Sequence, residues 1–271
     1  MLRYLLQGSD EAMKEKILRF INSIGIEKCG IAPYDNDFCA IVCLFPYFSG
    51  YKEGNLSVYT YSEDYHLIIK DKLALICDYL HSIAPDCRCE SFADIGPEID
   101  RLLAYEAGLG FYGKNHMLIN DDFGSYFFIG YIKCSLKLER DAPLDKTCLS
   151  CNECIKHCPG GALGTTFDIN RCASHISQKK GELSPEEKSI LKKSGLVFGC
   201  DQCQRVCPHN KALKPPMKEF CQNIKESISK SELEALSGRK FVEKYKNRAF
   251  SWRGKNVLLR NINIIEGTER K

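Results

Sequence analysis

The chain has 271 residues, of which 44% are apolar and 27% charged, and a formal net charge of +3. These values are ordinary for a globular protein with one large domain or two modest ones, and the charge alone does not indicate a polyanionic partner. The longest apolar run, residues 40–48, is well short of the ~20 residues that span a membrane, and the N-terminus becomes charged too early for a secretory signal, so we expect a cytoplasmic protein without membrane contact.

Helical and strand patterns alternate in the first half of the chain. Apolar spacing predicts a helix over 11–24, ended by Gly25, and a buried strand over 40–47, ended by Pro46. A long helix should begin at a Ser62 cap and stop at Pro85; its apolar face comprises Tyr65, Ile69, Leu73, Ile76, Leu80 and Ile83. A strand over 90–93, a helix over 98–107 opened by Pro97, and strands over 117–119 and 125–136 follow. The alternation predicts an α/β layer.

The composition changes near residues 141–146, where we expect a domain boundary. Ser184 and Glu187 form a capping box that should open a helix ending at Gly195. A basic, helical tail follows Pro215 and Pro216. Residues 238–271 contain ten Lys or Arg and three Asp or Glu, which fits either a solvated helix face or a surface for RNA or an acidic partner.

Sixteen cysteines are present, and in a chain without an export signal clustered cysteines indicate metal or redox chemistry. The run CLSCNECIKHCP (148–159) has the C-x2-C-x2-C-x3-C-P spacing of bacterial ferredoxins, in which the fourth cysteine ligates the other cluster. Structural zinc is the less favoured alternative, because it would use paired C-x2-C knuckles separated by a longer loop.

The second run, GCDQCQRVCP (199–208), contributes three cysteines and lacks a fourth ligand. If the two motifs exchange their last cysteines, Cys207 closes the first cluster and Cys158 joins the second, with Cys172 as the best candidate for the remaining position. The predicted ligand sets are Cys148, Cys151, Cys154 and Cys207 for one [4Fe–4S] cluster, and Cys158, Cys172, Cys200 and Cys203 for the other.

The other eight cysteines lack ligand spacing, and core packing explains most of them. Two adjacent clusters can transfer single electrons in sequence, and these electrons need an acceptor in the larger N-terminal domain. No dinucleotide fingerprint follows a strand, and the glycines of GLGFYG (108–113) follow a helix instead, so spacing alone does not name that acceptor.

One long block resembles a known family. FADIGPEIDRLLAYEAGLGFYGKNHMLINDDFGSYFFIGYI (92–132), AIVCLFPY (40–47), EDYH (63–66), both cysteine motifs, RCAS (171–174) and AFSWRGKNVLLRN (249–261) match the epoxyqueuosine reductases in order. The resemblance covers nearly the whole chain. It implies a cobalamin in the α/β domain beside the nearer cluster, a core similar to that of reductive dehalogenases, and reduction of epoxyqueuosine to queuosine in tRNA, the last step of queuosine synthesis.

Asp94 matches the family's proton donor. Loss of the epoxide oxygen as water needs a general acid, and burial against the corrin would raise the pKa of Asp94 above its ordinary value. The alternative is that Asp94 caps the helix that begins at Pro97.

Other positions carry over from the resemblance. The implied corrin contacts are Tyr59, Leu118, Ile129, Ser174 and Gly181. We expect His66 to be a hydrogen-bonding or core histidine rather than a cobalt ligand, because the family binds its corrin without one. Lys114 and Arg101 would face substrate phosphates, support the corrin, or lie on the surface.

The chain departs from the family in two places. Val58 and Thr60 replace an arginine and an alanine of a Ser-Arg-Tyr-Ala-type run. Full-length members also carry a helical-repeat domain after the Trp-Arg-Gly-Lys segment, which grips tRNA, and this chain ends about one helix into it. Because RNA affinity depends on the number of phosphate contacts, we expect weaker tRNA binding. A ferredoxin or flavodoxin is the expected electron donor.

The resulting expectation is an α+β protein with three parts: an α/β cobalamin-binding domain (1–140), a ferredoxin-like double-cluster domain (141–215) and a basic helical tail (216–271). Three functions remain open. The first is reduction of epoxyqueuosine in tRNA, the second is reduction of a small epoxide or organohalide by the same architecture, and the third is non-catalytic electron transfer. The 92–132 block argues against the third, because a carrier needs no proton donor.

Overall fold

A computed structural model describes residues 2–268. It has the mixed α and β fold expected from the sequence, with a four-stranded sheet in the order β1-β2-β6-β3 and a small β4–β5 hairpin. The strands are β1 Lys28–Pro33, β2 Cys39–Pro46, β3 Cys89–Ala93, β4 Phe111–Tyr112, β5 Leu118–Ile119 and β6 Phe127–Cys134. The α-helices are α1 Leu2–Ser23, α2 Tyr65–Ile83, α3 Asp100–Glu106, α4 Glu153–Lys156, α5 Ala173–Gln178, α6 Pro185–Ser194, α7 Gln202–Arg205, α8 Lys230–Glu234, α9 Gly238–Tyr245 and α10 Lys255–Glu266.

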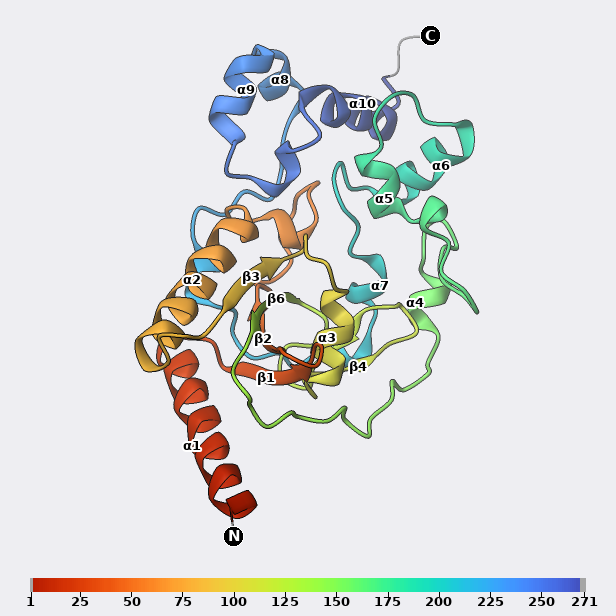
Figure 1. The fold of residues 1–271 in the computed structure, drawn as a ribbon. Coiled ribbons are helices and arrows are strands. Elements are labelled where there is room, and N and C mark those ends of the chain that lie inside the picture. Colours follow the sequence, from red (N-terminus) through yellow and green to blue (C-terminus); the bar gives the residue numbers. More distant parts are fainter. Residues whose placement is uncertain (1, 269–271) are drawn as a thin grey trace.

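Every pair of neighbouring strands in the main sheet is antiparallel. The central strand β2 is buried along its whole length, and its side chains alternate between the two faces. Ile41 and Phe45 pack with Ile69 of α2 on one face, while Val42 packs with Leu103 of α3 on the other. The sheet is therefore sandwiched between α2 and α3 (Figure 1).

Local signals set the helix ends, although not always at the predicted residue. Asp64, and not Ser62, caps α2 by accepting a hydrogen bond from the backbone N–H of His66; the Ser62 hydroxyl donates to the carbonyl of Glu63 instead. The predicted apolar face of α2 is confirmed, since Ile69, Leu73, Ile76 and Leu80 are buried. The capping box of α6, Ser184 with Glu187, is present as predicted.

The basic tail is helical and shares the core of the sheet domain. Phe241, Phe250 and Leu258 belong to the same buried cluster as Ile41 and Phe45. Helix α10 contacts α5, α6 and α8, so the tail lies at one end of the molecule beside the cysteine-rich segment (Figure 1). Residues 269–271 lie outside the described chain. No helix within residues 2–268 is long and apolar enough to cross a membrane.

Candidate functional site

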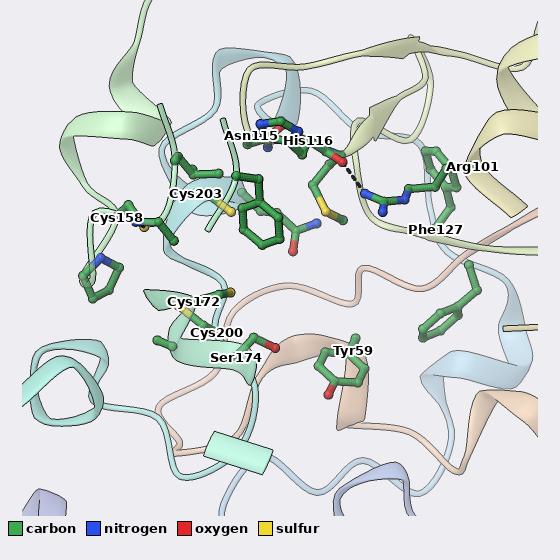
Figure 2. A pocket seen from close by; sticks show the side chains of 18 of the residues that line it. Tyr59, Arg101, Asn115, His116, Phe127, Cys158, Cys172, Ser174, Cys200 and Cys203 are labelled. Carbon is green, nitrogen blue, oxygen red and sulfur yellow. Dashed lines mark hydrogen bonds between the residues drawn. The ribbon is translucent and has the colours of Figure 1, made fainter. Parts of the chain in front are cut away.

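The cysteines of the two motifs surround two separate cavities. One small cavity is lined by the first predicted set, Cys148, Cys151, Cys154 and Cys207. A larger cavity of about 330 Å³ is lined at one end by the second set, Cys158, Cys172, Cys200 and Cys203 (Figure 2). Within residues 2–268, no group of three or more His, Cys, Asp or Glu is arranged to hold a single metal ion. The thiols instead surround spaces, which is how four corners of a cubane cluster are ligated.

Two short helices produce this exchange of cysteines. Cys158 follows α4 and Cys207 follows α7, and the two helices pack on each other, so each motif's last cysteine reaches the cavity of the other motif. Burial is the largest cause that raises the pKa of Cys200 to about 12, and the nearby Asp201, Cys172 and Cys158 contribute in the same direction. Such thiols need a positive partner to ionise, and an iron cluster provides one.

Two glycines allow the close approaches that bring the second set together. A Cβ on Gly160 would lie 2.0 Å from the carbonyl oxygen of Arg171, and the Arg171 side chain donates from Nε to the carbonyl of Gly160 at 2.6 Å. This contact holds the Cys172 loop beside Cys158. Gly199 has a φ of +78°, and a Cβ there would lie 2.4 Å from the Cβ of Ser57, so the segment before Cys200 lies directly against the segment that carries Tyr59.

Asp201 fixes that second contact. Its buried carboxylate accepts hydrogen bonds from the Ser57 hydroxyl and, at 2.9 Å, from the backbone N–H of Val58. Tyr59 is thereby held on the wall of the larger cavity, next to Ser174 (Figure 2).

The larger cavity extends away from the thiols between mostly apolar walls. Met117, Phe127 and Phe128 line it, together with the polar side chains of Asn115 and Gln204. The Nδ2 group of Asn115 is buried and has no hydrogen-bond partner among the described residues. A buried unpaired donor costs roughly 1–3 kcal/mol, so this amide is suited to a polar ligand in the cavity.

A third cavity, which is more open to solvent than the two lined by cysteines, contains Asp94. Arg101, Phe127 and Phe128 line both this cavity and the larger one, so the two spaces share one wall. Asp94 directly follows β3 in a left-handed conformation, with a φ of +63°, which is uncommon for a residue with a side chain and marks functional sites. The carboxylate is 60% exposed.

Asp94 does not cap a helix. Helix α3 begins at Asp100 after Ile99, and the carboxylate of Asp100 accepts from the backbone N–H of Asp94 at 3.0 Å. The Asp94 carboxylate instead accepts from the hydroxyl of Tyr65 at 2.9 Å and lies 3.4 Å from Nε2 of His66. The capping alternative is therefore wrong.

The pKa of Asp94 is lowered in this structure, and the rise expected from burial against a corrin stays a prediction. The contact with His66 lowers the pKa, burial opposes that effect, and the Tyr65 hydrogen bond lowers it further. His66 shows the reciprocal effect: Asp64 and then Asp94 raise its pKa from 6.5 to about 9. At neutral pH the proton therefore lies on the imidazole, and His66 is a hydrogen-bonding histidine, as expected, since its Nδ1 bonds to Asp64 Oδ1 at 2.7 Å.

The remaining predicted contacts divide between the two cavities and the core. Tyr59 and Ser174 line the larger cavity and Ile129 lines the Asp94 cavity. Leu118 is buried in the core, with its neighbour Met117 on the cavity wall, and Gly181 lies beyond α5 without lining either cavity.

The two predicted cations lie near the site in different roles. Lys114 Nζ donates to Asn152 Oδ1 at 3.0 Å, beside the first cysteine set, and Arg101 donates to the carbonyl of His116. Sequence reasoning missed Asn115, Met117 and Gln204. The first two lie inside the 92–132 block and the third between two cluster cysteines, so only their position beside motif residues could have signalled them.

Comparisons with known proteins agree with this geometry. Residues 147–210 match the model of the 4Fe-4S double cluster binding domain, and residues 39–95 match the model described as epoxyqueuosine reductase QueG, DUF1730. The chain therefore carries a double [4Fe–4S] cluster domain. The epoxyqueuosine reductase of Lactococcus garvieae is 35% identical over 216 residues, which are 78% of this chain and 61% of that protein. The epoxyqueuosine reductase of Leadbetterella byssophila is 32% identical over 214 residues, which are 78% of this chain and 70% of that protein.

Solved structures extend the likeness to the whole fold. Epoxyqueuosine reductase from Streptococcus thermophilus superposes with a TM-score of 0.79 at 26% identity, over 93% of this chain and 80% of that one. An epoxyqueuosine reductase in complex with an epoxyqueuosine-modified tRNA stem loop gives a TM-score of 0.82 at 27% identity, over 94% and 80%. A reductive dehalogenase, at 14% identity and a TM-score of 0.55, shares the fold.

The chain spans about 60% of the length of the curated relatives that it matches first. Three findings agree: the family model matched over β2 and α2, the double-cluster domain, and the identity of 32% to a relative of which this chain covers 70%. This chain belongs to the epoxyqueuosine reductase family.

Proposed function

We propose that this chain reduces epoxyqueuosine to queuosine in tRNA, with electrons that pass through two [4Fe–4S] clusters to a cobalamin. The observation that carries the proposal is the shared wall of the two cavities: four thiols line one end of the first, and Asp94 lines the second. The family membership and the relative solved with a modified tRNA stem loop supply the substrate class.

The predicted cysteine sets are the proposed cluster ligands. The cluster held by Cys148, Cys151, Cys154 and Cys207 is the outer one, since Cys151 is exposed, and it would receive electrons from an external donor such as a ferredoxin or flavodoxin. The cluster held by Cys158, Cys172, Cys200 and Cys203 is the inner one, since these thiols line the larger cavity.

The residues of the larger cavity fit a corrin. Apolar walls from Met117, Phe127 and Phe128 suit the faces of a flat macrocycle, and the unpaired Nδ2 donor of Asn115 suits the amides at its rim. Bound there, cobalamin supplies low-potential electrons to a strained substrate carbon. Tyr59 and Ser174 are the proposed contacts nearest the thiols, and Ile129 lies on the Asp94 side; Leu118 and Gly181 would act through packing and backbone alone.

Removal of the epoxide oxygen as water, leaving an alkene, consumes two electrons and two protons. Asp94 is the proposed donor of the proton to the departing oxygen. Because the pKa of His66 is raised to about 9, the imidazolium would hold that proton at Nε2, 3.4 Å from Asp94 Oδ2, until the oxygen leaves. The hydroxyl of Tyr65 orients the carboxylate, and the second proton comes from solvent.

The basic tail supports RNA as the partner. Arg239, Lys240, Lys244 and Lys246 are exposed, and cations attract the phosphate backbone. We propose that the tail contributes to tRNA binding, more weakly than the repeat domain of full-length members. In this proposal residues 1–140 bind cobalamin, residues 141–215 hold the two clusters and residues 216–271 contact the RNA. The proposed compartment is the cytoplasm.

The test is turnover by the anaerobically purified holoenzyme, reconstituted with iron, sulfide and cobalamin, on epoxyqueuosine-containing tRNA. Asp94→Asn should keep the iron content and the corrin absorption band and lose turnover by about 10²–10⁴-fold. Asp86→Asn, in the exposed turn after α2, is the matched control and should behave as wild type. Retained turnover in Asp94→Asn would remove its acid role, and turnover of a small epoxide or organohalide but not of tRNA would replace the substrate.

A further inference from the structure

Trp252 is the only tryptophan of the chain, and it is 58% exposed. It follows the short 3₁₀ turn Ala249–Ser251 and precedes α10, at the end of the molecule where the tail meets α5 and α6 (Figure 1). A large aromatic ring that the core does not bury is a common feature of recognition surfaces.

Hydrogen bonds connect the indole to the wall of the larger cavity. Trp252 donates from Nε1 to Oε1 of Gln178 at 3.2 Å, and Gln178 donates from Nε2 to the carbonyl of Ser174 at 3.1 Å. Ser174 lines the larger cavity. The exposed ring is therefore held in a fixed orientation, two hydrogen bonds from the proposed active site.

Arg253 adds a positive charge to the ring. Its guanidinium lies over the indole, 3.5 Å from the ring centroid, and forms no hydrogen bond or ion pair recorded among residues 2–268; its Nε is buried and without a partner. Arg253 covers one side of the ring, and more than half of Trp252 stays exposed. Lys180, two residues after Gln178, is also exposed.

An aromatic face beside an unpaired cation is the chemistry that binds a nucleotide. Unpaired RNA bases stack on tryptophan and on guanidinium planes, and the phosphate pairs with the cation. We propose that Trp252 and Arg253 form a stacking platform for an unpaired base in the loop of the tRNA stem loop that carries the substrate, with the phosphate of that nucleotide on Arg253. This inference rests on the proposed function, since it assumes that the substrate nucleotide is carried by a single-stranded RNA loop.

The single tryptophan provides a direct test. An unmodified tRNA stem-loop RNA, titrated into the anaerobic holoenzyme, should quench the Trp252 emission, while a fully paired RNA duplex of the same stem sequence should leave it unchanged. Trp252→Ala should weaken binding of labelled stem-loop RNA on the order of 10-fold, as loss of one stacked base does. Trp252→Phe, which keeps a stacking face, should stay within about threefold of wild type.

Charge is tested separately. Arg253→Met should weaken stem-loop binding and reduce its salt dependence by about one phosphate contact, whereas Arg239→Ala, an exposed arginine on α9, should reduce stem-loop and duplex binding alike.

Unchanged stem-loop affinity in Trp252→Ala, or equal quenching by the duplex, would overturn the platform and leave Trp252 as a packing contact between the tail and α5. If wild type reduces epoxyqueuosine tRNA while Trp252→Ala binds it normally, the platform fails and the proposed function stands. Loop-specific quenching without turnover would support the platform and contradict the function.

Discussion

Replacement of His66 by glutamine tests how the proton is held at Asp94. The imidazole contacts Asp64 through Nδ1 at 2.7 Å and Asp94 through Nε2 at 3.4 Å. A pKa of about 9 in place of 6.5 corresponds to at most about 3 kcal/mol. Because 39% of the His66 side chain and 60% of the Asp94 side chain are exposed, solvent screening reduces the contribution to about 1 kcal/mol.

The pH window follows from the directions of the two pKa shifts. The pKa of His66 is raised, so its stabilisation is complete below pH 6.5 and is lost as the pH rises through about 9. The pKa of Asp94 is lowered from 3.8, so its contribution is complete above that pH and is lost as the pH falls below it. Asp64, Tyr65 and Asp100 also face this pair and remain in the variant.

The assay is the pH profile of single-turnover reduction of epoxyqueuosine tRNA. Wild type should lose activity as the pH rises through about 9, where His66 deprotonates. His66→Gln should lose activity at a lower pH, set by Asp94 alone, and be slower by on the order of 10²-fold at neutral pH. His81→Gln, on the exposed side of α2, is the control. A His66→Gln profile that superimposes on that of wild type would refute a proton shared between His66 and Asp94.

Four further substitutions probe the clusters and the scaffold. Cys172→Ala should halve the iron content and stop reduction of bound cobalamin, whereas Cys148→Ala should also halve the iron but keep the inner cluster's EPR signal; full iron loading in either variant would contradict the ligand sets. Gly160→Ala should lower iron incorporation, measured by iron analysis, because its Cβ meets the carbonyl of Arg171 at 2.0 Å and overpacking costs roughly 1–3 kcal/mol; normal loading would show that the contact relaxes freely. Ser184→Ala should lower the thermal midpoint through loss of the capping box, by about 1 kcal/mol of stability, with normal cluster spectra, and an unchanged midpoint would contradict it.

Periodicity predicted the elements that carry strong apolar patterns. The long helix and the buried strand formed as expected, α2 within three residues of its predicted start and β2 within one residue at each end. Strand β1, with only six residues and no alternation, was missed because its partner β2 supplies the pairing. The sequence also predicted no strand direction, since an antiparallel order depends on contacts between distant segments.

The grouping of the cysteines around two cavities could be predicted because motif spacing is a local property of the chain. The contact between Asp94 and His66 could not be predicted, because it depends on β3 and α2 lying side by side. The chain turns at Asp94 with a left-handed φ, which directs its carboxylate to His66 and Tyr65. Motif matching identified the residue, while its low pKa became apparent only in three dimensions.

The most direct test of the account is mass spectrometry of nucleosides from epoxyqueuosine-containing tRNA after incubation with the reduced holoenzyme. The account predicts conversion to queuosine that requires both clusters and cobalamin and is lost in Asp94→Asn. Unchanged epoxyqueuosine, with clusters and cobalamin fully loaded and reduced, would contradict it.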